Sequence, residues 1–455
     1  MDILNNQDKI NWKPYERVLF RFFFIYFILQ AVPLDWKYYV RLFQLNWFNL
    51  QFQDIFNISR YTPQLLETER SIDFWGIHTF GDWGILTAIA LLGGLIWSLF
   101  KKKQDNYVGL YYVLRVILRY RLAIGVIAYG FIKLFPLQSP YPSLSDLNTN
   151  YGDLSAWRLF SLSLGVAPSF EYFLGAVEIF AGLLLFYRKT VFIGSFIILC
   201  FTGNVFLSNL AYEGGETVYS LYLIQFALFL LCYDAPRLFR LLSLERPTYP
   251  SIYRPVYPKV WQAKAQLILK SVFILFFVVL YGFKTYAAYQ KGPYHYPEQQ
   301  DADLAGFYDV SRFVFNGTSL PYNRTDSIRW ENVVIERWPT LSIKTGKQAQ
   351  PVISNVELIH PLSEARNFEY AGTVGRHYYR YQLDTMAKTF VMNSLGNNNE
   401  QESYKLTFDR HNDRTILLHG TTGKGDSLTI TLNKIEKKYL LEEAGKVGRR
   451  SRLVL

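Results

Sequence analysis

The pattern of hydrophobic and polar residues divides the chain near residue 290. Seven apolar segments precede this position, each close to the roughly 20 helical residues that cross a hydrocarbon core about 30 Å thick. We therefore predict a polytopic α-helical membrane protein with about seven transmembrane helices. The predicted spans are residues 17–34, 82–100, 117–135, 168–187, 190–210, 217–233 and 266–287.

Short segments in which apolar and polar residues alternate follow residue 290, separated by turn-forming residues such as Gly396–Asn399. A period of two is typical of strands with one buried face. The segments predict an antiparallel all-β domain of about 120 residues, either a barrel or a sandwich. The predicted strands lie in 329–338, 340–345, 352–359, 377–383, 388–395, 403–409, 414–420, 427–433 and 437–443.

Two segments near the β domain require a separate interpretation. Residues 303–315 (DLAGFYDVSRFVF) are predicted to form a short helix that joins the last span to the β domain. Residues 420–427 (GTTGKGDS) lack the GxxxxGK[ST] spacing of a phosphate-binding loop and lie between two strands, so they predict a hairpin turn.

These elements predict six regions along the chain. They are a membrane region with two spans and an aromatic outer loop (1–107), a four-helix membrane bundle (108–235), a cytoplasmic linker with the seventh span (236–290), a connector (291–325), an extracytoplasmic β domain (326–445) and a tail (446–455). The aromatic outer loop, residues 35–80, is expected to contain an interfacial helix, since Trp and Tyr favour the headgroup region.

The distribution of charge predicts the orientation. The formal net charge is +11, and residues 1–289 hold 26 Lys and Arg against 18 Asp and Glu. Basic clusters at 101–103, 188–189 and 237–264 all fall on one side of the predicted membrane, which the positive-inside rule assigns to the cytoplasm. The N-terminus is then cytoplasmic, and an odd number of spans places the β domain outside. No basic helix or aromatic RNA-binding motif accompanies this charge, so nucleic acid is not an expected partner.

Polar residues within the predicted spans are the candidate ligand-binding residues, because ionisable groups in a membrane are expensive to bury. Glu171 and Glu178 are seven residues apart, on one face of the fourth span. Tyr129 and Lys133 lie near the outer end of the third span. Asn204 and Gln225 lie in the outer halves of the fifth and sixth spans. If these side chains face one another, they form a cavity open to the outside. Alternatively, Lys133 reaches the interface, Lys133 and Glu178 form a structural pair, and the amides link helices.

No established catalytic or metal-binding motif is present in the sequence. The patterns HExxH, GxGxxG and Walker A are missing, and the histidines lack the spacing of metal ligands. We therefore assign no catalytic residue, predict no metal and expect no haem.

Residues 129–235 are similar to the DoxX-like family of bacterial membrane proteins. The similarity rests on YGFIKLFPLQSPYPSL, NYGDLSAW, EIFAGLLLFYRKT and GNVFLSNLAYEGGE, in this order. The resemblance implies a four-helix bundle made by the third to sixth spans, in the inner membrane of a bacterium with two membranes, and a periplasmic β domain. One departure is the acidic Tyr212–Glu216 (YEGGE), where the family has a YDVP-like segment ending in lysine.

Three hypotheses for the function follow. In the first, the chain is an accessory subunit of a redox, respiratory or envelope assembly that binds quinone or a lipid in its bundle, as the family resemblance implies. In the second, it is a non-catalytic scaffold whose β domain binds a protein partner while the bundle anchors it in the bilayer. The third is a membrane enzyme similar to vitamin K-dependent carboxylases, on the analogy of a helical bundle followed by a β module.

Overall fold

The computed structural model describes residues 12–34, 36–63, 65, 80–100, 107–248, 259–292, 302–350, 369–384, 386–395 and 402–447. Its internal contacts separate two compact units. The helical unit comprises Met1–Phe135, Tyr172–Ala211 and Glu216–Gln290, and the barrel unit comprises Pro136–Glu171, Tyr212–Gly215 and Lys291–Leu455.

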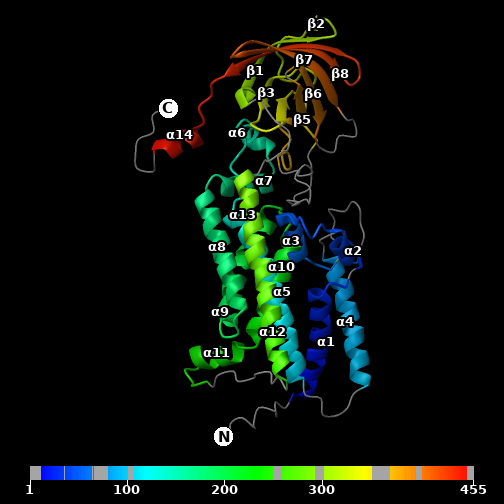
Figure 1. Cartoon of the computed structure of the whole chain (residues 1–455), viewed down its shortest axis with the longest axis vertical. Coiled ribbons are helices and arrows are strands. Elements are labelled where there is room, and N and C mark those ends of the chain that lie inside the picture. Colours follow the sequence, from blue (N-terminus) through cyan, green and yellow to red (C-terminus); the bar gives the residue numbers. More distant parts are fainter. Residues whose placement is uncertain are drawn as a thin grey trace. The chain divides into compact units, whose positions relative to one another are not determined.

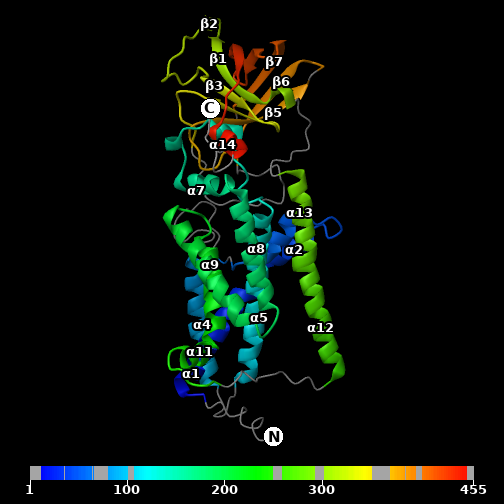
Figure 2. The same ribbon diagram turned by 90° about the vertical axis from the view of Figure 1, so that its left-hand side faces the viewer.

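The helical unit consists of long helices with short amphipathic helices between them (Figures 1 and 2). Its helices are α1 (Pro14–Ala31), α2 (Trp36–Gln44), α3 (Phe52–Ser59), α4 (Gly81–Leu99), α5 (Val108–Leu134), α8 (Pro168–Leu185), whose first turn belongs to the barrel unit, α9 (Val191–Ala211), α10 (Thr217–Cys232), α11 (Ala235–Leu242), α12 (Val260–Ile274) and α13 (Tyr281–Lys291). A π-helical segment, Leu275–Leu280, makes α12 and α13 one continuous helix.

Four helices among the described residues are long and apolar enough to cross a membrane: α4, α8, α9 and the continuous helix Val260–Lys291. Helices α10 and α11, which meet at an angle of 63°, together make a fifth candidate. The other two predicted spans are helical as well, in α1 and α5, but these helices contain two and three arginines respectively. The structure thus confirms a helical region with membrane-length apolar helices, and the number of seven crossings stays a prediction.

Much of helix α5 is buried, and glycines allow α8 to approach it closely. Leu114, Leu118 and Leu122 of α5 are completely buried. A Cβ atom on Gly175 of α8 would clash with the backbone of α5, at the amide nitrogen of Leu134. Glycine is therefore required at this crossing, because any side chain would push the two backbones apart.

The first loop contains two helices with different surroundings. Helix α2 has exposed aromatic residues, with Trp36 74% exposed and Phe43 79% exposed, as expected of an interfacial helix. Helix α3 differs from that expectation, because Ile55 and Phe56 are buried and the Phe56 ring lies 5.1 Å from the ring of Tyr129 on α5. The first loop therefore contributes side chains to the interior of the helical unit.

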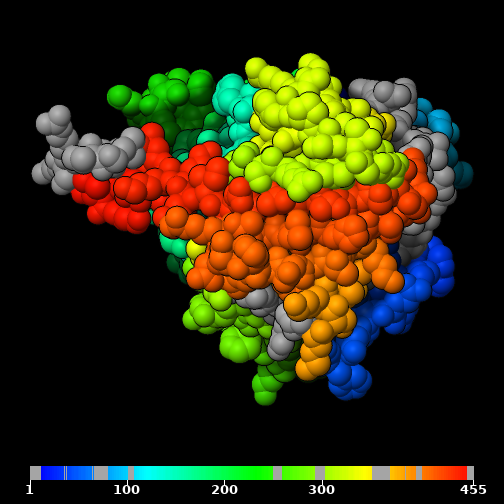
Figure 3. Space-filling view, turned by 90° about the horizontal axis from the view of Figure 1, so that it is seen from above, coloured from blue at the N-terminus to red at the C-terminus, as the bar shows by residue number. Residues whose placement is uncertain are grey.

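The β domain is a closed antiparallel barrel of eight strands, β1 and β3–β9, in which β9 pairs with β1 and each other strand with the next. Figure 3 shows β9 between β1 and β8. The short strand β2 extends the end of β1. The strands are β1 (Gly306–Phe315), β2 (Thr318–Ser319), β3 (Asn332–Ile335), β4 (Thr340–Lys344), β5 (His377–Asp384), β6 (Thr389–Ser394), β7 (Ser403–Asn412), β8 (Thr415–Thr422) and β9 (Ser427–Ile435).

The structure corrects two of the predicted elements. Residues 306–315 form strand β1 instead of a helix; a bulge between Val310 and Arg312 breaks the alternation, so that Tyr308, Val310 and Phe313 are buried at uneven spacing. Residues 437–443 do not form a strand, because β1 and β8 already occupy both edges of β9, and helix α14 (Leu440–Val447) begins there. The hairpin turn predicted at 420–427 is confirmed between β8 and β9. The predicted strand at 352–359 and the turn at 396–399 lie outside the described residues.

Side chains fill the barrel interior. Leu428, Ile430 and Leu432 alternate along β9 and point inward, with Ile430 paired to Phe313 on β1 and to Leu418 on β8. The void that these core residues leave is about 10 Å³, which is room for roughly one water molecule. This void, among the described residues of the barrel, is too small for an organic ligand.

Candidate functional site

Lys133 and Glu178 form a buried ion pair between α5 and α8. The Lys133 Nζ atom donates to Glu178 Oε1 at 2.5 Å, and the two side chains are 12% and 7% exposed. Glu178 Oε2 is buried and has no hydrogen-bond partner. A buried carboxylate oxygen without a hydrogen-bond donor costs free energy. Glu178 Oε2 can therefore accept a proton, or a hydrogen bond from a donor group on a ligand.

Tyr129 belongs to a second polar group, formed with the first loop and the start of α10. Arg60, which follows α3, donates through Nε to Tyr129 Oη at 2.7 Å and through Nη2 to Glu216 Oε1 at 2.7 Å. The Tyr129 hydroxyl donates to Glu216 Oε2 at 2.8 Å. Lys133 Nζ lies 6.0 Å from the centre of the Tyr129 ring. The two polar groups are therefore neighbours along one helix.

The other candidate residues lie elsewhere. Gln225 Oε1 accepts a hydrogen bond from Tyr26 of α1 at 3.2 Å, so this amide links α10 to α1. Asn204 is exposed on α9. Glu171, in the barrel unit, accepts from the Ser139 backbone N–H at 3.2 Å. Of the six residues, the contacts bring together Tyr129, Lys133 and Glu178, and they place Asn204 on the outer surface of the helices.

One arginine and two tyrosines extend this polar stripe, and the sequence analysis did not single them out. Arg121, Tyr129 and Lys133 are spaced along one face of α5. Arg121 donates to Tyr222 Oη at 3.2 Å and to the Tyr61 carbonyl at 2.5 Å. The Tyr219 hydroxyl is buried without a hydrogen-bond partner, and its ring lies 5.4 Å from that of Tyr129. The helical unit thus contains a continuous buried stripe with unsatisfied polar atoms.

No single pattern in the sequence could have identified these partners. Glu216 was visible only as a departure from the DoxX-like loop, and Arg60 as one of several basic residues in a long loop. Their pairing depends on the inward packing of α3, which positions Arg60 beside α5. Long-range packing of this kind leaves no local periodicity to read.

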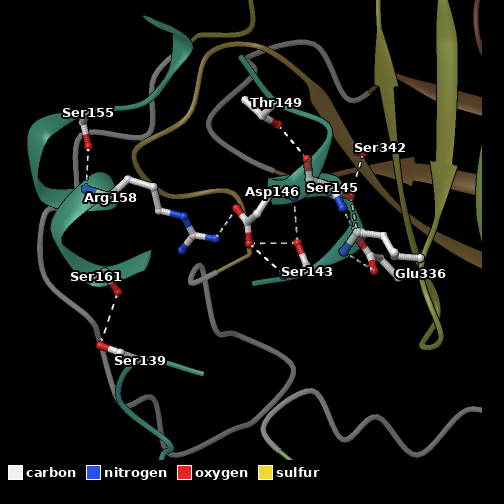
Figure 4. Close-up of polar contacts among 11 residues, drawn as sticks. Ser139, Ser143, Ser145, Asp146, Thr149, Ser155, Arg158, Ser161, Glu336 and Ser342 are labelled. Atoms are coloured by element: carbon white, nitrogen blue, oxygen red, sulfur yellow. Dashed lines mark hydrogen bonds and ion pairs between the residues drawn. The ribbon is translucent and has the colours of Figure 1, made fainter. Parts of the chain in front are cut away.

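A second buried polar cluster lies within the barrel unit (Figure 4). Helix α6 (Leu144–Leu147) begins at Ser143, which forms a capping box with Asp146, and Asp146 pairs with Arg158 of α7 (Ala156–Gly165) at 2.7 Å. Glu336, in the turn after β3, accepts from the Ser145 backbone N–H at 2.7 Å and from the Ser145 hydroxyl at 2.6 Å. These bonds attach the segment 136–171 to the barrel.

Burial and neighbouring acids perturb the ionisation of this cluster. Glu336 is only 2% exposed, and the pKa of its carboxyl is raised to about 7. Burial is the main cause, the neighbouring acids Glu369 and Asp146 add to it, and the hydrogen bonds from Ser145 partly oppose it. Burial lowers the pKa of Arg376 to about 10; this guanidinium donates to Ser342 and Asn332.

The S-x-x-D capping box at 143–146 was a readable signal for the start of α6.

Comparison with protein families, with curated proteins and with solved structures finds no significant match for this chain.

Proposed function

We propose that this chain is a DoxX-like integral protein of a bacterial inner membrane, with seven spans, a cytoplasmic N-terminus and a periplasmic barrel. The membrane-length apolar helices support this location. Arg21 of α1 and Arg121 of α5 do not argue against it, because both guanidinium groups donate hydrogen bonds inside the helical unit. Arg21 donates to Tyr107 and Ser98, and Arg121 donates to Tyr222 and backbone carbonyls. Buried cations with such partners are tolerated within membranes.

In this proposal the helical unit binds the polar head of a quinone or a similar lipid-like molecule, as an accessory subunit of a redox or envelope assembly. The observation that carries it is the buried Lys133–Glu178 pair, whose second carboxylate oxygen has no donor. A quinone head group carries two carbonyl oxygens, which require donors. Lys133 supplies N–H donors, and Glu178 supplies an O–H when protonated.

The test is purification of the protein from native membranes in mild detergent, followed by mass spectrometry of all lipids and proteins that remain bound. We expect a quinone in stoichiometric amount, together with subunits of a redox or envelope assembly. The double variant Lys133→Met with Glu178→Leu should lose the quinone and keep its thermal stability, because apolar residues of similar volume can replace a buried ion pair at little cost.

The matched control is Asn204→Ala, which changes an exposed polar residue on the neighbouring helix α9. This variant should retain as much bound quinone as the unaltered protein. Equal quinone in all three proteins, or none in any of them, contradicts the assignment of the ligand to Lys133 and Glu178.

A second candidate function is a scaffold whose barrel binds a protein partner. The filled interior of the described part of the barrel favours it, because core side chains occupy that space and leave the outer surface and loops for binding. The same purification separates the two candidates. A partner protein at fixed stoichiometry without bound quinone supports the scaffold.

A further inference from the structure

Arg115 and Arg119 lie four residues apart near the start of α5 and rest on tyrosine rings. The guanidinium carbon of Arg115 is 3.4 Å from the ring centre of Tyr233, which follows α10. The guanidinium carbon of Arg119 is 5.2 Å from the ring centre of Tyr120. Stacking on an aromatic face holds a guanidinium in place and leaves its N–H groups free to bind a ligand in the plane of the group.

Neither arginine has a carboxylate counter-ion in the part of the chain that the structure describes. The Nε atoms of both are buried without a hydrogen-bond partner. Asp234, the residue after Tyr233, instead lies 3.6 Å from Arg237. Both residues are partly exposed, which places them at the surface of the helical unit. Two fixed cations without a counter-ion form an anion-binding site of the kind that favours phosphate.

The surroundings indicate that this anion carries an apolar part. Leu110 and Val113 are 39% and 48% exposed on the same segment of α5. The short helix α11 places Arg237 and Arg240 beside the exposed apolar side chains of Phe239 and Leu242. This composition is typical of a helix that lies in the membrane interface, where lipid phosphate groups are concentrated.

We propose that Arg115 and Arg119 bind the phosphate group of an anionic phospholipid in the cytoplasmic leaflet. This inference rests on the membrane location proposed above, and it does not depend on the Lys133–Glu178 site. The lipid phosphate accepts hydrogen bonds from both guanidinium groups, and its acyl chains lie against the apolar residues of α5.

The test measures phospholipids bound to the full-length protein by native mass spectrometry after transfer into mixed micelles of phosphatidylglycerol and phosphatidylcholine. We expect preferential retention of phosphatidylglycerol, and the double variant Arg115→Gln with Arg119→Gln should weaken it by about tenfold or more. The control Arg410→Gln with Arg414→Gln removes the same charge from the barrel surface and should leave retention unchanged.

A second variant, Tyr233→Leu, keeps both charges and removes the ring under Arg115, so it should weaken the preference for phosphatidylglycerol to a smaller extent. Equal retention of the two lipids overturns the proposal. Displacement of phosphatidylglycerol by millimolar glycerol 3-phosphate also overturns it, in favour of a soluble phosphate ligand. Release of the protein from membranes by alkaline carbonate contradicts the membrane location itself, which separates the two failures.

Discussion

At the scale of single residues, the molecule contains two kinds of buried carboxyl group. Glu178 has a lysine partner and one oxygen without a donor. Glu336 accepts hydrogen bonds from the backbone N–H groups of Leu144 and Ser145 and from the Ser145 hydroxyl, all of which belong to α6. The arrangement around Glu178 suits the binding of a ligand or a proton within the helices. The arrangement around Glu336 should make the attachment of the segment 136–171 to the barrel depend on pH.

The raised pKa of Glu336 predicts that the free energy of unfolding depends on pH. Its pKa is raised from 4.5 to about 7 in the folded protein, so the folded state binds the proton more tightly than the unfolded state does. The free energy of unfolding should therefore fall as pH rises from about 4.5 to about 7, by roughly 3 kcal/mol at about 1.4 kcal/mol per pKa unit. Glu336→Gln, which cannot ionise, should remove this dependence.

The measurement is the unfolding midpoint of the purified full-length protein at about pH 5 and about pH 8, with and without the substitution. The change in midpoint between the two pH values is compared for the unaltered protein and for Glu336→Gln. The difference between these two changes is the contribution of Glu336, because the other titrating groups contribute equally to both proteins. An identical loss of stability at high pH in both proteins shows that Glu336 does not cause it.

The sequence allowed part of this chemistry to be anticipated. Lys133 and Glu178 were identifiable because charged residues within long apolar segments are rare. Asn204 is an uncharged polar residue in a predicted span and is nevertheless exposed, since helical periodicity alone does not reveal which face meets a neighbouring helix. Glu336 lies in a polar segment of the β domain, where a glutamate is unremarkable, and its burial results from α6, which is 191 residues away from it in sequence.

At the scale of elements, patterns with regular period were readable and irregular ones were not. Strands such as β8 and β9 alternate strictly and were predicted correctly. Strand β1 was misread as a helix because its bulge changes the spacing of buried residues from two to three. Helix α14 was misread as a strand because closure of the barrel, which removes every free edge, is a property of the whole sheet.

The close crossing of α5 and α8 predicts that one added methyl group at Gly175 strongly lowers stability. Gly175→Ala should destabilise the helical unit by several kcal/mol, because the added Cβ would overlap the backbone of α5 at Gly130 and Leu134, which cannot move aside as a flexible side chain can. Gly203→Ala in α9 is the matched control, since nothing lies within 4 Å of its added Cβ. The control should be neutral or slightly stabilising, because alanine favours helix by about 1 kcal/mol over glycine.

Thermal unfolding of both variants in the same detergent checks this prediction. Similar midpoints for Gly175→Ala and Gly203→Ala would show that α5 and α8 do not pack at this distance.

At the scale of the whole molecule, the proposed membrane topology depends on the number of helices that cross the bilayer. Hydropathy and length identify four or five, and the remaining two candidates, α1 and α5, contain arginines. Helix α5 has 27 residues, about 40 Å at 1.5 Å per residue, which exceeds the hydrocarbon thickness. Its central Arg121 is satisfied internally by Tyr222 and by carbonyl groups. In the proposed topology, α5 is therefore a span.

Labelling with a membrane-impermeant maleimide tests this count through its parity. The native Cys200 and Cys232 are first replaced by alanine. A single cysteine is then introduced in turn at each of three exposed positions, Phe48, Arg240 and Met386. Five predicted spans separate positions 48 and 240, and one separates 240 from 386. Positions 48 and 386 should therefore react in spheroplasts, and position 240 only after lysis. If the cysteine at position 48 instead reacts only after lysis, as at position 240, an even number of helices crosses the membrane between them. Helix α5 is then the first span to reconsider, because it carries the most charge. If 386 behaves like 240, Val260–Lys291 does not cross and the barrel is cytoplasmic.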